Sequence, residues 1–191
     1  SLTTAGGGTI LFENTGAGGV SFGTVSTTGD GSPLNGEDDI TLSSDGGDLT
    51  ITTSVTADGD GDVILNTTNA GNVILTGTTT AAGHEVTVNS VGSISGAGLV
   101  TAATVDLNAA TGIMANLAAS TITADNSTSG DVDIDNALAG AVTVSSLTTA
   151  GGGTILFENT GAGGVSFGTV STTGDGSPLN GEDDITLSSD G

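Results

Sequence analysis

The sequence contains no lysine, arginine, cysteine, tryptophan or tyrosine, and it has only one histidine and two prolines. The absence of cysteine excludes disulfides and thiol chemistry. Because no basic residue offsets the 22 aspartates and glutamates, the formal net charge is −22 at pH 7. Such a chain repels nucleic acids and anionic membranes, so we expect neither as a partner. Apolar runs are only a few residues long, and no membrane insertion is expected.

The same absences argue against an enzyme. His84 is the only histidine, and it stands beside Glu85 without a cysteine or a catalytic motif nearby. Asp38 and Asp39 are similar to the paired aspartates of β-helical polygalacturonases, but the histidine and basic motifs that accompany that pair are missing. The β-helical pectate lyases also rely on basic residues. We therefore expect a protein without catalytic activity.

The residues that are abundant favour strands. The chain has 34 glycines, and its hydrophobic fraction of 35% is rich in valine, isoleucine and leucine, with many threonines beside them. Branched side chains favour strands, whereas frequent glycine disfavours helices. No apolar pattern with the 3.6-residue period of an amphipathic helix is present. The composition predicts an all-β protein.

A long repeat organises the chain. Residues Ser1–Gly46 recur without a single change at Ser146–Gly191, which sets a period of 145 residues. We expect residues 1–191 to form one continuous segment, with residues 1–145 as one full repeat and residues 146–191 as the start of the next identical one. Two identical stretches are expected to superimpose after a whole number of turns.

A shorter unit recurs inside the long repeat, with apolar residues alternating around a first inward position. These positions are Ile10, Ile40, Val63, Val86, Val105 and Val132, followed by Ile155 and Ile185 in the second copy. Alternation by two indicates strands with one buried face. Short strands separated by glycine, asparagine or aspartate turns predict a right-handed parallel β-helix (β-solenoid), with about 24 residues per coil and six coils per 145-residue repeat.

The segments GDLTITTSVTADGDGDVILNTT and GNVILTGTTTAAGHEVTVNSVGSISGAG resemble the repetitive shafts of large secreted bacterial adhesins. The nearest families are the filamentous-haemagglutinin-like and autotransporter-type parallel β-helices. The resemblance covers the whole chain in style and brings no functional residues with it. It implies an extracellular, cell-surface rod that holds binding modules away from the cell. Its expected partners are other copies or further repeats of the same protein, joined end to end.

Carboxylates cluster at one expected corner. Asp39, Asp62 and Glu85 each precede an inward position, and Asp58 and Asp60 lie close by in sequence. Stacked like charges repel, and only solvent cations can offset them in a chain without basic residues. Calcium prefers such oxygen ligands, so these five residues are a candidate calcium site. A diffusely screened acidic surface is the alternative.

A second corner column contains Asn66, Asn89 and Asn108, with Asp135 as a later member. Stacked asparagines can hydrogen-bond to one another, so we interpret the column as structural. The alternative to a structural rod is a module that binds cations or carbohydrate through its acidic face or through the loop of residues 30–37. Pro33 should exclude this loop from the strand ladder.

Overall fold

The computed structural model describes residues 1–29, 38–174 and 183–190, and all regular secondary structure in them is β-strand. No helix in these ranges is long and apolar enough to cross a membrane. The all-β prediction is therefore confirmed. The strands are β1 (Leu2–Thr3), β2 (Ile10–Asn14), β3 (Val20–Ser26), β4 (Ile40–Gly46), β5 (Leu49–Ala57), β6 (Val63–Ala70), β7 (Val73–Leu75), β8 (Thr78–Ser90), β9 (Ile94–Ser95), β10 (Leu99–Ala109), β11 (Ile113–Asn126), β12 (Val132–Asn136), β13 (Val142–Ala150), β14 (Ile155–Asn159), β15 (Val165–Thr173) and β16 (Ile185–Ser189).

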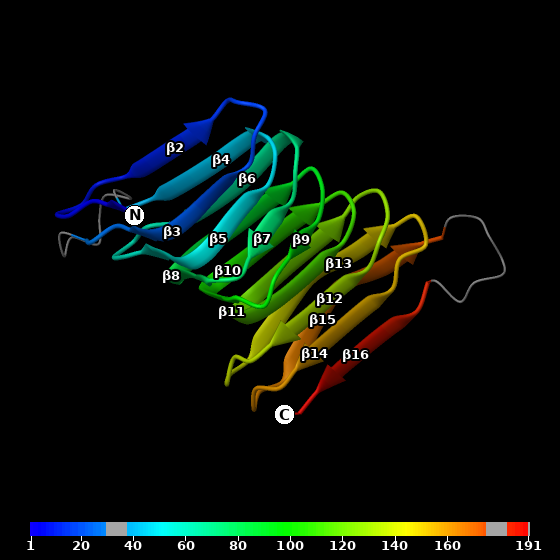
Figure 1. The fold of residues 1–191 in the computed structure, drawn as a ribbon. Helices are drawn as coiled ribbons and strands as arrows, with labels where there is room; N and C mark the ends of the chain where they lie inside the picture. Colours follow the sequence, from blue (N-terminus) through cyan, green and yellow to red (C-terminus); the bar gives the residue numbers. More distant parts are fainter. Residues whose placement is uncertain (30–37, 175–182, 191) are drawn as a thin grey trace.

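The sixteen strands form one parallel sheet that closes on itself (Figure 1). Six of them, β5, β7, β9, β11, β10 and β8, form a closed ring, and the other ten pair outside it. The predicted right-handed parallel β-helix with six coils per repeat is therefore wrong. The architecture is a closed six-stranded parallel barrel extended by further strands.

Alanine explains why the sheet closes. Ala81, Ala102 and Ala119 are buried and lie in register where β8, β10 and β11 bend. Because a methyl group needs little room, each strand can continue around the bend instead of ending at a turn. The three strands are consequently 13, 11 and 14 residues long. Each therefore pairs along more than one side of the molecule, which joins all strands into one sheet.

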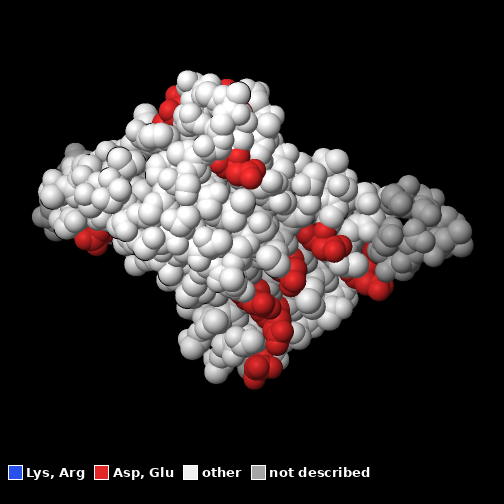
Figure 2. Space-filling model, in the orientation of Figure 1, with Lys and Arg blue, Asp and Glu red and all other residues white. Residues whose placement is uncertain are grey.

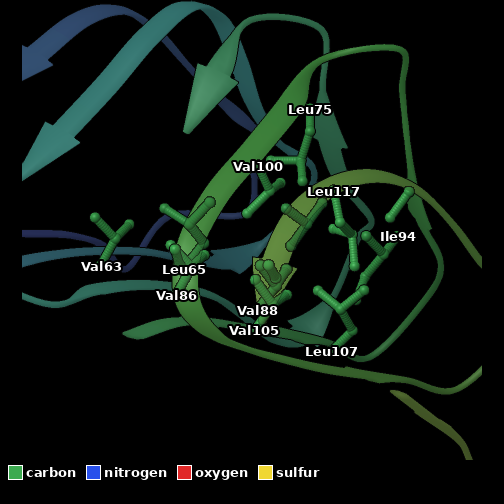
Figure 3. Close-up of a cluster of buried hydrophobic side chains, with 14 of the residues drawn as sticks. Val63, Leu65, Leu75, Val86, Val88, Ile94, Val100, Val105, Leu107 and Leu117 are labelled. Atoms are coloured by element: carbon green, nitrogen blue, oxygen red, sulfur yellow. The ribbon is translucent and has the colours of Figure 1, made fainter. Parts of the chain in front are cut away.

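Inward side chains stack in two main columns, which we name after their first residues. The Ile10 column contains Ile10, Ile40, Val63, Val86, Val105, Ile122, Val144 and Phe167. The Val20 column contains Val20, Leu49, Val73, Ile94, Ile113, Val132, Ile155 and Ile185. Figure 3 shows side chains of both columns converging on one core.

The columns correct the predicted inward positions. The first five, from Ile10 to Val105, do lie in one column, but Val105 pairs with Ile122, and Val132 belongs to the Val20 column. The step from Val105 to Ile122 is only 17 residues, whereas the step from Val63 to Val86 is 23. A circuit, meaning the chain between successive members of one column, is therefore shortest where β10 and β11 bend at alanine. The regular spacing expected from the sequence misses this shortening.

The two identical stretches consequently occupy different columns. Ile10 begins the Ile10 column, whereas its copy Ile155 lies in the Val20 column. The expectation that they superimpose after six whole turns is wrong, because 145 residues span an odd number of half circuits. Local pairing is nevertheless the same in both copies. Leu2 pairs with Val25 as Leu147 pairs with Val170.

The phenylalanines repeat this local agreement. Phe12 and Phe22 meet edge to face with ring centroids 5.0 Å apart, and Phe157 and Phe167 do so at 5.4 Å. Edge-to-face contact is a favourable arrangement for two aromatic rings. Each stretch therefore keeps its own folding pattern, while the circuits between them decide which side of the molecule it occupies.

Candidate functional site

Three of the five predicted calcium ligands form a hydrogen-bonded column. The backbone N–H of Asp62 donates to Asp39 Oδ1 at 2.9 Å, and the N–H of Glu85 donates to Asp62 Oδ1 at 2.9 Å. Each carboxylate therefore accepts a bond from the circuit above it. A charged acceptor strengthens such a bond, so the column has a structural role.

The other two predicted ligands lie in the turn that precedes β6. Asp58 accepts hydrogen bonds from the backbone N–H groups of Gly59, at 2.9 Å, and Gly29, at 3.3 Å. Asp60 belongs to the same turn. Within residues 1–29, 38–174 and 183–190, no group of three histidine, cysteine or acidic side chains is placed to hold a metal ion. The calcium site thus stays a prediction, and the loop of residues 30–37 lies outside the described residues.

The same device occurs at two positions that the sequence analysis missed. Asp48 Oδ1 accepts from the N–H of Asn72 at 2.8 Å, and Asn72 Oδ1 accepts from the N–H of Ser93 at 2.9 Å. Asp131 Oδ1 accepts from the N–H of Thr154 at 2.8 Å. A recurring aspartate or asparagine immediately before a strand is the sequence signal that could have identified it.

The predicted asparagine column is confirmed in its central part. Asn89 Nδ2 donates to Asn66 Oδ1 at 2.9 Å, and Asn108 Nδ2 donates to Asn89 Oδ1 at 3.0 Å. The next member is Asp125, because Asn108 pairs with it, so the assignment of Asp135 to this column is wrong. The misassignment has the same cause as that of Val132, namely the short circuit between β10 and β11.

An open groove of about 370 Å³ lies beside this column. Its lining includes Asn89, Asn108 and Asp125 together with the exposed side chain of Val91. Asp125 Oδ1 already accepts bonds from the hydroxyls of Ser146, at 3.0 Å, and Thr148, at 2.6 Å. The polar groups of the groove therefore bond mainly to one another. We assign the groove to the corner of the sheet and to no chemical step.

A second acidic group lies on and beside β12. Asp131 precedes this strand, Asp133 and Asp135 alternate outward along it, and Asp135 pairs in register with Glu158 on β14. Burial raises the pKa of Asp133, and the charges of Asp135 and Asp131 raise it further. On the face shown in Figure 2, acidic side chains gather in a row without a basic one among them.

Asp106, on β10, is perturbed in the same direction. Burial raises its pKa, a hydrogen bond with Asn108 lowers it, and the charges of Glu85 and Asp125 raise it again. Its Oδ1 atom is buried without a hydrogen-bond partner. This carboxylate therefore costs stability when it is ionised.

The chain was compared with protein-family models, with curated proteins and with solved structures, and it matches none of them.

We predict that Asp62→Ala lowers the free energy of unfolding by about 1 kcal/mol, because the backbone N–H of Glu85 loses its acceptor. Asp62→Asn keeps an acceptor oxygen at this position and should retain most of the stability. Urea unfolding of the two variants measures the difference. Equal losses would show that the charge of Asp62 matters and its hydrogen bond does not.

A second prediction concerns pH. Because the folded state raises the pKa of Asp133, folding favours its protonated form, and stability should rise as the pH falls through that folded-state pKa. Asp133→Asn should raise Tm at pH 7 and reduce the gain on acidification. Glu13→Gln, which removes one charge from an exposed strand position, is the control. An identical pH profile in Asp133→Asn and the parent would contradict the prediction.

The calcium prediction is tested by thermal unfolding in calcium chloride and in sodium chloride at the same ionic strength. A specific site requires a larger rise in Tm with millimolar calcium, because a bound divalent ion would relieve repulsion among the carboxylates more than screening does. Equal rises in the two salts would leave only a screened acidic surface.

Proposed function

We propose that this chain is a structural segment of a long, tandemly repeated extracellular filament or adhesin stalk, without catalytic activity. The observation that carries the proposal is that the same 46-residue sequence occurs twice and pairs in the same way both times. A sequence that folds identically at two positions can be added repeatedly without new contacts having to be invented. Further copies or repeats of the same protein are the proposed partners.

The stacking of the core supports a role in spanning distance. The two columns run through the described strands with apolar side chains at every level. Each added circuit would extend both columns by one strand spacing of about 4.8 Å. Length can therefore grow with the number of residues, while the cross-section stays the same.

The surface charge supports an exposed, non-aggregating segment. Every charged side chain apart from the single histidine is acidic, and the net charge is −22. Like charge on neighbouring segments opposes lateral association and favours solubility. The extracellular location follows from the resemblance to adhesin shafts and belongs to the proposal.

The odd number of half circuits has a consequence for such a filament. A feature on one side of the molecule in one repeat would appear on the other side in the next. Leu11 lies on the β2 side of the molecule, whereas its copy Leu156 lies on the side formed by β12, β14 and β16. Surface features would therefore alternate, and the complete pattern would recur after two repeats.

Chains with one, two and three copies of the 145-residue repeat, each followed by the 46-residue stretch, test this function. We predict that each added repeat increases the maximum dimension in small-angle X-ray scattering by the same amount, about 30 Å for stacked strands. The cross-sectional radius should not change. A dimension that stays constant or increases irregularly, as for separately folded beads, would refute a continuous segment.

A further inference from the structure

The side chains at the free edge of β16 are exposed although their copies are buried. Ile185 is 43% exposed and Leu187 is 38% exposed, whereas Ile40 and Leu42, which are the same residues in the first copy, are fully buried. In both copies the ILFEN strand lies on one side, β2 beside β4 and β14 beside β16. The difference is β6, which pairs with the other edge of β4, while no described strand pairs with that edge of β16.

The strand that would cover β16 must resemble β6. Valine, isoleucine and leucine begin β6, so Val63 and Leu65 point inward above Ile40 and Leu42. β2 begins Ile-Leu-Phe and carries the same apolar pattern, with Ile10 and Phe12 at the inward positions. The pairs β2–β4 and β14–β16 show that the two sequences are compatible as parallel neighbours in register.

β2 also has an edge that can accept a partner. It pairs with β4 alone among the described strands, so its opposite edge is open. Open strand edges with apolar inward residues are templates for pairing with another chain. The free edges of β16 and β2 are at opposite ends of the molecule, and both strands run parallel to their neighbours (Figure 1).

We propose that a second copy of this chain docks its β2 edge on the β16 edge of the first copy, in parallel and in register, with Ile10 above Ile185 and Phe12 above Leu187. The inference rests on the proposed structural function and names its contact. The ILFEN sequence already occupies this column once, as Ile155. A second copy would therefore enter the column in a position that the chain itself uses.

Another column agrees with this placement. In the docked pair, Leu2 of the second copy lies above Val170 of the first. Leu147, which is the copy of Leu2, already pairs with Val170 on its other edge, and Leu2 pairs with Val25. Leucine and valine thus alternate in this column within one molecule and across the contact.

The symmetry of the contact determines the assembly. Two different edges meet, so the contact is heterologous and each docked copy leaves one edge of each kind open. The assembly is consequently an open filament. Because each copy carries a charge of −22, association requires screening and should increase with salt concentration.

Engineered cysteines test the register, since the natural sequence has none. In the proposed pairing, Thr186 lies opposite Leu11 of the next copy, and both side chains are exposed. Adjacent parallel strands bring such Cα atoms about 4.8 Å apart, within the range of a disulfide. We expect a mixture of the Thr186→Cys and Leu11→Cys chains to form a disulfide-linked heterodimer under mild oxidation at high salt. A mixture of Thr186→Cys with Met114→Cys, which places the thiol at an exposed position on β11, should not do so.

Sedimentation of the full chain gives the second arm. Leu187→Asp should abolish concentration-dependent association, whereas Leu156→Asp should leave it unchanged. Leu156 is the matched control, because it is 39% exposed on the outer face of β14 and adds the same charge. Circular dichroism verifies that both variants fold. Equal cross-linking to Leu11→Cys and Met114→Cys, or equal effects of the two aspartates, would overturn the proposal. Because the tandem-repeat measurement does not depend on docking between chains, its outcome distinguishes failure of the contact from failure of the proposed function.

Discussion

Each strand in this protein is buried by the strands on its two sides, and the rest of the structure depends on that mutual cover. An inward side chain touches its equivalents in the neighbouring circuits, so the core is a set of columns. Ile40 and Leu42 are fully buried between β2 and β6, whereas the same residues on β16 are about two-fifths exposed. Burial is therefore a property of a residue's neighbours along the column as much as of the residue itself.

A chain without lysine and arginine has to satisfy its polar groups by other means. Carboxylates and amides immediately before the strands accept N–H groups from the next circuit, as Asp39 does for Asp62 and Asp48 for Asn72. Inside the molecule, buried Asn136 donates from Nδ2 to Asn159 Oδ1 at 3.0 Å and accepts from the N–H of Ala119 at 3.0 Å. Neutral amides can enter the core because such bonds satisfy them, whereas ionised side chains remain at the surface and repel one another.

The bends at Ala81, Ala102 and Ala119 connect local sequence with global arrangement. They shorten the circuits in the middle of the chain, and this shortening moves the second 46-residue stretch half a circuit away from the first. For a tandem filament, the same sequence would therefore face opposite sides in successive repeats. A strictly regular repeat could present its surface in one direction only, so the irregular middle circuits broaden what an otherwise uniform segment can display.

The sequence by itself determined the strand content, the inward alternation, the registers from Ile10 to Val105 and the asparagine ladder from Asn66 to Asn108. These features depend on spacing along one or two adjacent circuits, which local pattern records directly. It did not determine that Val105 is followed by Ile122, that Val132 belongs to the other column, or that the sheet closes into a ring. Both Ile122 and Val132 are apolar residues in alternating segments, so either could continue the column. Only the tertiary structure decided between them, because the choice depends on how tightly the backbone bends at buried alanines, and that bend exists only when three neighbouring strands pack against one another.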